Sequence, residues 1–290
     1  MLRLHPPNLI SNRPRRTGRR MEQTLLSINL TDEEQDLKKR IVLSERHGHV
    51  LVITMNRPER RNALGRVMRQ GLRDAFDEFE ADPDLRCAVL TGTGAAFSAG
   101  GDLKEMSDSA MRVPPKDSDI MISSNGSVSK PVVAAVNGVA LAGGFRLVQN
   151  CDLAVAADTA RFGITEVLRG RGAPWAAPLI NIVPQRIMAQ LLLTGEPIDA
   201  HRAYEVGLIN SVVSVEDLLP VAIDLAQRIA AAAPLSVRAA KTLIGLCTEI
   251  GVTQAEQSAN LAYESVYTSN DAQEGPRAFA EKRDPVWTGT

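Results

Sequence analysis

The period of the hydrophobic and polar positions changes several times along the chain. Residues 41–55 (IVLSERHGHVLVITM) contain two runs rich in β-branched residues around a His-Gly-His turn, a pattern typical of a β-hairpin. Residues 64–82 (LGRVMRQGLRDAFDEFEAD) place apolar side chains three and four positions apart, which indicates an amphipathic helix. The pattern therefore predicts a hairpin followed by a helix.

Three short runs are apolar without polar alternation: residues 86–94 (RCAVLTGTG), 130–138 (KPVVAAVNG) and 151–158 (CDLAVAAD). Strands of this kind are typical of a sheet that is covered on both faces. Helical stretches separate them. The sequence thus predicts an α/β core of repeated β-β-α or β-α units.

After about residue 184 nearly every segment has a helical pattern, and the chain ends in the charged stretch GPRAFAEKRDPVW (residues 275–287). The first twenty residues contain six arginines, three prolines and no acid, a composition that cannot bury a core. Arginine richness without acids is also typical of a transit peptide, but the prolines and the nearby Met21 favour a solvated tail or a later start codon. We expect a disordered basic tail at 1–21, an α/β core at 22–215 and a helical region at 216–290.

The amino-acid composition excludes several classes of function. The 290 residues are 44% apolar and carry a formal net charge of −1, which argues against nucleic acid as the main ligand. Three well-separated cysteines show no metal-binding or disulfide spacing, and no apolar run approaches the roughly 20 residues that span a bilayer. We expect a cytoplasmic protein without a bound metal and without a membrane or nucleic-acid partner.

Two loops rich in small residues follow predicted buried strands: AFSAGGDLKEM (residues 96–106) and NGVALAGGFRL (residues 137–147). Small residues allow a ligand to approach the backbone, and a helix N-terminus has amide N–H groups without internal partners. Two such loops together could direct one N–H each at a single oxygen, as in an oxyanion hole, where each donor contributes roughly 3 kcal/mol in the transition state. Two tight turns with glycine for steric reasons alone are the alternative.

Four segments together carry a resemblance to a known family. MNRPERRNAL (residues 55–64), AFSAGGDLKEM, the stretch from KPVVAAVNGVALAGGFRL to FGITE (residues 130–166) and LLLTGEPIDAHRAYEVGLINSVV (residues 191–213) resemble the crotonase superfamily, the enoyl-CoA hydratase/isomerase family, in order and spacing. The resemblance implies the crotonase (ClpP-like) fold of β-β-α units with C-terminal helices used for trimerisation, in trimers that often pair into hexamers. It also implies an acyl-coenzyme A thioester substrate and an enolate-type intermediate. Coenzyme A is then part of the substrate, and no separate cofactor is expected.

Individual positions follow from the same resemblance. The two oxyanion donors match the N–H groups of Ala99 and Gly143, and the adenine pocket matches the backbone around Gly101, Asp102 and Leu103.

Further substrate-binding positions are more distant along the chain. Ala63 and Leu64 match the loop that faces coenzyme A, and Trp175 lies in an unusual stretch, RGRGAPWAAPL, that reshapes the acyl end. Phe279 and Lys282 match positions that help to close the coenzyme A site, sometimes from a neighbouring subunit.

One position departs from the pattern of the family. Hydratases of this family add water with two glutamates, of which the second matches Glu166 and the first is replaced by Arg146. An arginine has no acceptor and stays protonated, so it cannot take a proton from water. Arg146 could bind an anionic acyl group, pair with Glu166 and lower its pKa, or point inertly to solvent.

The sequence therefore predicts an acyl-CoA enzyme with one glutamate as acid and base, an isomerase or an atypical hydratase or lyase rather than an ordinary hydratase. A loop carboxylate such as Glu166 could instead be solvated or cap a helix. The alternative for the whole chain is a non-catalytic protein that binds acyl-CoA. Nucleic-acid binding would have to depend on the basic N-terminal tail.

Overall fold

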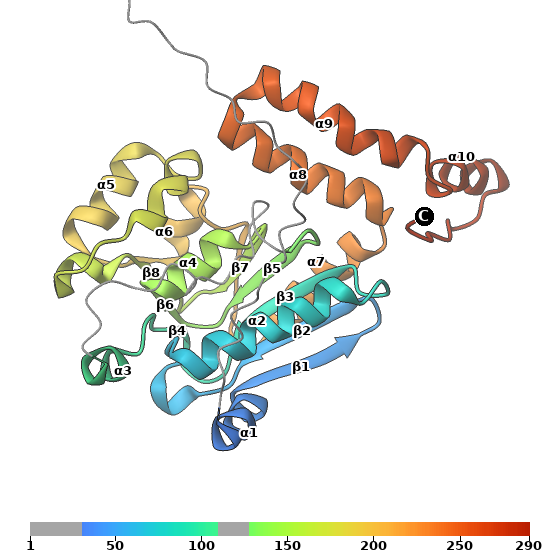
Figure 1. Ribbon diagram of the computed structural model, residues 1–290. Helices are drawn as coiled ribbons and strands as arrows, with labels where there is room; N and C mark the ends of the chain where they lie inside the picture. The colour runs from blue at the N-terminus through green and yellow to red at the C-terminus, as the bar shows by residue number, and fades with distance from the viewer. Residues whose placement is uncertain (1–30, 110–127) are drawn as a thin grey trace, which may run out of the picture.

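The computed structural model describes residues 31–109 and 128–290, and the predicted tail at 1–21 lies outside these ranges. Two sheets form the centre of the molecule (Figure 1). The larger sheet has the order β1 (Val42–His47), β2 (Val50–Met55), β3 (Cys87–Gly92), β5 (Val132–Val136), β7 (Leu153–Ala157) and β10 (Ser211–Val213). The smaller sheet has the order β4 (Ala96–Ser98), β6 (Val139–Leu141), β8 (Arg161–Gly163) and β9 (Ile198–Asp199).

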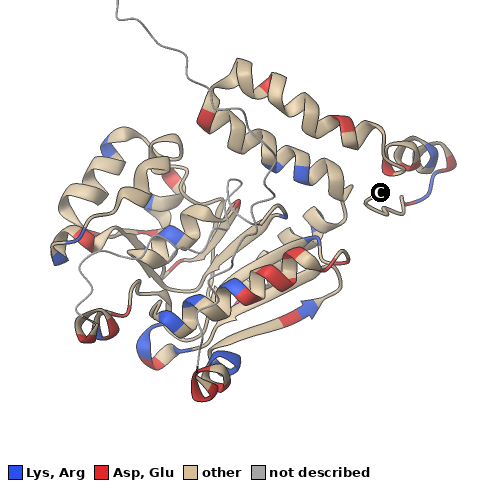
Figure 2. Ribbon diagram, viewed as in Figure 1, with Lys and Arg blue, Asp and Glu red and all other residues tan. Residues whose placement is uncertain are grey.

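The predicted hairpin is confirmed, because β1 and β2 pair antiparallel around a turn that brings His47 opposite Val50. The remaining pairs of the larger sheet are parallel. The central strands carry no charged residue, and Figure 2 shows them tan, whereas α2 (Arg66–Ala81) carries basic residues in its first half and acidic residues in its second. The helix predicted from Leu64 onward is therefore also confirmed.

Repeated β-β-α units generate both sheets at once. The described order β3-β4-α3, β5-β6-α4 and β7-β8-η2 places the first strand of each unit in the larger sheet and the second strand in the smaller one. The third elements are α3 (Leu103–Asp108), α4 (Gly143–Asn150) and the 3-10 helix η2 (Thr165–Arg169). This arrangement confirms the predicted α/β fold of repeated units.

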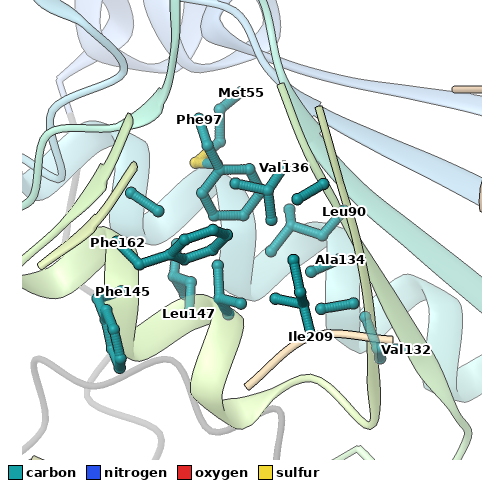
Figure 3. Close-up of a cluster of buried hydrophobic side chains, with 14 of the residues drawn as sticks. Met55, Leu90, Phe97, Val132, Ala134, Val136, Phe145, Leu147, Phe162 and Ile209 are labelled. Atoms are coloured by element: carbon teal, nitrogen blue, oxygen red, sulfur yellow. The ribbon is translucent and has the colours of Figure 1, made fainter. Parts of the chain in front are cut away.

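Helices cover both faces of the larger sheet. Alternate residues along each strand point to opposite faces. One set, including Val52 and Val89, packs against the alanine-rich face of α7 (Leu218–Ala230). The other set meets α2 and the smaller sheet in the main core, where Phe97, Phe145 and Phe162 are fully buried (Figure 3).

Further helices surround and extend this core: α1 (Asp32–Ile41), η1 (Pro58–Arg60), η3 (Pro174–Asn181), α5 (Gln185–Thr194), α6 (Ala200–Glu205), α8 (Pro234–Ile250), α9 (Val252–Tyr267) and α10 (Asp271–Glu281). Helices α8, α9 and α10 extend away from the sheets (Figure 1), while α7 belongs to the core. The helical region predicted at 216–290 thus contains one core helix and three projecting ones.

Candidate active site

The candidate residues lie directly after three neighbouring parallel strands of the smaller sheet. In the ladder β4-β6-β8, Ser98 lies opposite Ala140 and Leu141 lies opposite Gly163. Each strand is followed directly by a site segment: the loop with Ala99 to Asp102 after β4, the start of α4 after β6, and η2 with Glu166 after β8. Because the carboxyl ends of parallel strands meet at one edge, the fold gathers segments that are up to 67 residues apart in the sequence, as 99 and 166 are.

The first two segments touch backbone to backbone, and glycine is required for that contact. A Cβ on Gly144 would lie 2.2 Å from the carbonyl oxygen of Ser98. A Cβ on Gly100, which has a φ of +88°, would lie 2.8 Å from the oxygen of Leu141 and 3.1 Å from the nitrogen of Gly143. The two small-residue loops therefore converge as the sequence predicted.

The structure corrects the first of the two predicted donors. The N–H of Ala99 donates to the carbonyl oxygen of Arg61 at 2.9 Å, so that donor is already used. By contrast, within residues 31–109 and 128–290 the N–H groups of Gly101 and Gly143 have no hydrogen-bond acceptor. A Cβ built on Gly143 would lie 3.8 Å from the nitrogen of Gly101, which places these two amides next to each other. Ala99 was the wrong choice, and Gly101 is the neighbour that has a free donor.

Leu64 and Asp102 hold this loop in place. The N–H of Leu64 donates to the oxygen of Gly100 at 2.8 Å, and the Leu64 side chain reaches the position of Gly143. Asp102 caps α3 by accepting from the amides of Lys104 and Glu105. It also pairs with Arg57 at 3.4 Å.

The other predicted coenzyme A contacts lie at different places on this chain. Ala63 is half-buried next to Leu64, and Leu103 is 57% exposed at the start of α3. Phe279 is 87% exposed on α10, and Lys282 ends that helix in the left-handed conformation. In Figure 1, α10 lies far from α3 and α4, so one chain does not bring Phe279 and Lys282 to its own site.

Glu166 is half-buried in η2 with two different oxygens. Its Oε1 accepts a hydrogen bond from Nε1 of Trp175 at 3.1 Å, whereas Oε2 is buried and has no partner within the described residues. Burial raises the pKa of the Glu166 carboxyl, and hydrogen bonds from its own amide and from Trp175 only partly oppose that rise. Glu166 therefore does not behave as a solvated loop carboxylate.

Arg146 lies in the first turn of α4, with its N–H bonded to the oxygen of Ala142. The residue is half-buried. Burial is the largest influence on the pKa of Glu166, and Arg146 is not among the groups that lower it. The guanidinium of Arg146 is also close to the positive, N-terminal end of the α4 dipole, an unfavourable position for a cation.

Two features that the sequence analysis missed emerge from these contacts. Gly101 was assigned only to the adenine pocket, and the hydrogen bond of Ala99 shows that, among the described residues, the N–H of Gly101 rather than that of Ala99 has no acceptor. Trp175 was expected only to shape the acyl end, but it also hydrogen-bonds Glu166.

Neither metal ligation nor a simple membrane span is indicated for the described parts of the chain. They contain no group of three or more His, Cys, Asp or Glu side chains suited to a metal ion. No single described helix has the length and apolarity to cross a bilayer, although the sharply bent pair α7 and α8 would satisfy both criteria together.

Comparisons with known proteins agree with this geometry. Residues 45–290 match the family model described as enoyl-CoA hydratase/isomerase. The chain is 40% identical to enoyl-CoA hydratase EchA19 of Mycobacterium tuberculosis (84% of this chain, 94% of the relative) and 38% identical to carnitinyl-CoA dehydratase of Citrobacter koseri (84% and 97%). The crystal structure of an enoyl-CoA hydratase from M. tuberculosis H37Rv superposes with a TM-score of 0.79 at 38% identity, covering 87% of this chain and all of that one. The chain therefore belongs to the enoyl-CoA hydratase/isomerase family of the crotonase superfamily and has its fold.

Proposed function

We propose that this protein is an acyl-CoA enzyme that forms a thioester enolate with one carboxylate, Glu166, as both acid and base. The observation that carries the proposal is the pair of adjacent, unbonded N–H groups of Gly101 and Gly143 at the strand edge that also carries Glu166. A thioester oxygen bound by both amides would be stabilised as negative charge develops on it.

The simplest reaction for Glu166 and the two amides is the shift of a double bond. Glu166 takes a proton from C2 of a 3-enoyl-CoA, and the electrons of that C–H bond move to the thioester oxygen held by the two amides. The same carboxyl then returns the proton to C4, and the double bond ends between C2 and C3. One carboxylate with a raised pKa suits both steps, because it accepts and returns a proton near neutral pH.

Ordinary hydration needs a second acceptor to activate water, and Arg146 stands where the family's hydratases have that glutamate. An arginine offers only donors. We infer an isomerase or an atypical hydratase or lyase, and an acyl group whose own carboxylate Arg146 binds through a two-pronged contact. Because two relatives are named as a hydratase and a dehydratase, the proposal includes dehydration of an acyl-CoA as a possible reaction.

We also propose that the working unit is a trimer or a pair of trimers, with Phe279 and Lys282 closing the coenzyme A site of a neighbouring subunit. Their exposure on α10 supports this arrangement. Exposed apolar residues on the projecting helices also support it: Ile244, Val252, Leu261 and Tyr267.

The test is the conversion of 3-hexenoyl-CoA to its conjugated isomer, with exchange of the C2 protons of butyryl-CoA in D₂O as a second readout. Glu166→Gln should lower both rates about 10²–10⁴-fold while the thioesters still bind. Unchanged rates in Glu166→Gln would refute catalysis by Glu166. An inactive wild type that still binds both thioesters would favour a non-catalytic acyl-CoA-binding protein.

The acyl preference has its own measurement. A thermal-shift comparison of glutaryl-CoA with butyryl-CoA should show stronger stabilisation by the dicarboxylyl ester, and Arg146→Ala should remove that difference. Equal stabilisation of the wild type by both esters would contradict anion recognition by Arg146.

A further inference from the structure

The two oxygens of Glu166 have different surroundings. Oε1 is held by the indole N–H of Trp175 at 3.1 Å. Oε2 is buried without a hydrogen-bond partner in the described parts of the chain. A carboxylate held in this way has one oxygen fixed by the protein and one available to a bound molecule.

Trp175 is itself held at two further points, both on α4. Its ring packs against Phe145 with 6.1 Å between the ring centres and a tilt of 44°. Its carbonyl oxygen accepts from Nε2 of Gln149 at 3.0 Å. Since Gly143 begins α4, Trp175 connects the oxyanion helix to the carboxylate.

The anchor for this connection is rigid. Phe145 is fully buried and also meets Phe162 of β8 edge to face, with 6.4 Å between the ring centres. Figure 3 shows Phe145 and Phe162 side by side in the cluster of buried side chains. A tryptophan seated on such a surface has little freedom to rotate, so the direction of its N–H is set by the core.

We propose that Trp175 is a positioning residue: it holds Oε1 of Glu166 at a fixed place relative to α4, so that Oε2 is the atom that exchanges the proton with the substrate. This inference rests on the function proposed above. It separates the two oxygens of one carboxylate by role, with Oε1 for orientation and Oε2 for proton transfer.

The hydrogen bond from Trp175 acts on the ionisation of Glu166. Helices α4, η2 and α5 and the link between η2 and η3 carry arginines, and Glu166 is the one carboxylate in these segments and η3. The arginines are Arg146, Arg169, Arg171 and Arg186. Cations can only lower the pKa of a carboxyl, so the raised pKa of Glu166 comes from burial, and the indole N–H opposes that rise by stabilising the charged form.

The experiment removes the indole N–H of Trp175 in two ways, one that changes the shape of the side chain and one that keeps it. Trp175→Phe removes the donor and part of the ring, and 3-benzothienylalanine at position 175 keeps the bicyclic shape but has sulfur where the N–H was. The matched control is Trp287→Phe, because Nε1 of Trp287 donates to the oxygen of Ala231 at 2.8 Å near the C-terminus. Rates with 3-hexenoyl-CoA are measured across pH, together with the unfolding midpoint of each protein.

Both changes at 175 should lower kcat about tenfold or more with KM changed less than twofold, since a misdirected base loses rate rather than affinity. The limb of the pH profile at which activity falls with acid should move to higher pH, because the charged carboxylate loses a donor. A ¹³C NMR titration of the Glu166 carboxyl should show the same direction. Trp287→Phe should leave kcat, the pH profile and the titration unchanged.

The result that would overturn the inference is a benzothienylalanine protein with the wild-type kcat, pH limb and carboxyl titration. A fall in unfolding midpoint alone, with these three quantities unchanged, would also overturn it, because it would show a purely structural tryptophan. Failure of the proposed function is a different outcome, in which Glu166→Gln itself retains full activity.

Discussion

The proposed oxyanion side and the proposed acid/base side of this site differ in what fixes the positions of their atoms. On the oxyanion side the backbone does so: Gly100 and Gly144 lie so close to the neighbouring loop that a Cβ at either would meet an oxygen at 2.8 Å or less. On the acid/base side, side chains do so through one hydrogen bond between Trp175 and Glu166 and one ring contact with Phe145.

This difference explains where the chain departs from the family pattern. A backbone contact this close requires glycine, whereas a side chain such as that of Arg146, which the resemblance places where the family's hydratases have a glutamate, can change without changing the backbone. In the proposed function, the oxyanion side is the part common to reactions on this fold, and the acid/base side is the part that selects the reaction.

The largest effect should come from the backbone side. Gly144→Ala would place a methyl group 2.2 Å from the carbonyl oxygen of Ser98, and neither loop can yield without displacing Gly143. We expect a loss of about 3 kcal/mol or more in the free energy of unfolding. Chemical denaturation measures it, with Gly172→Ala as the control, because a Cβ there meets only Pro174 at 3.9 Å. Equal stability of the two variants would contradict the close packing of the loops.

The next largest effect tests the acid/base side. The wild type should hydrate crotonyl-CoA very slowly, and Arg146→Glu should not lower that rate but raise it about tenfold, since it supplies a second carboxylate near Glu166. Hydration by the wild type at a rate similar to its isomerisation of 3-hexenoyl-CoA would contradict the single-carboxylate mechanism. Arg186→Glu on α5 is the control for a change of charge alone, and it should leave the hydration rate unchanged.

Much of the fold could be predicted because hydrophobic pattern and strand length determine it locally. The hairpin ending at Met55, the helix ending at Ala81 and the three buried strands all have the periods that the structure shows. Long-range contacts were less accessible. The hydrogen bond from Ala99 to Arg61 involves a residue in the left-handed conformation, since Arg61 has a φ of 50°. The sequence pattern does not predict this conformation.

The candidate site shows the same division. Glu166 and Gly143 were proposed from the family resemblance, and each lies directly after a strand, so their place in the fold follows from chain order. The bond between Trp175 and Glu166 joins η3 to η2 across an irregular connection, and its existence depends on ring packing against Phe145. Sequence spacing carries no information on such packing.

A smaller effect concerns how Gly101 is held. Asp102 accepts from two amides of α3, so Asp102→Ala should cost about 1 kcal/mol of stability and Asp102→Asn much less. Because the same residue follows Gly101, the alanine variant should also raise KM for acyl-CoA thioesters. Thermal unfolding and steady-state kinetics measure the two effects, with Asp108→Ala at the other end of α3 as the control. A loss in Asp102→Asn equal to that in Asp102→Ala would show that the charge pair with Arg57, rather than the cap, stabilises the loop.

The smallest effect is a pH dependence of stability that tests the ionisation of Glu166 without any substrate. Burial raises its pKa in the folded protein, so between the ordinary value and the raised value the folded state binds more protons than the unfolded state. The carboxyl of Glu166 therefore destabilises the folded protein most at neutral pH, where it is charged and buried. This destabilisation disappears as the pH falls below the ordinary pKa of glutamate. Glu166→Gln does not titrate, so its stability relative to the wild type should rise from pH 4 to pH 7 by under about 1 kcal/mol. Denaturation of the wild type and of Glu166→Gln at both pH values measures this difference. A difference of the opposite sign would mean that a cation such as Arg146 dominates the carboxyl, and the single-base mechanism would then lose the property that makes Glu166 suitable for it.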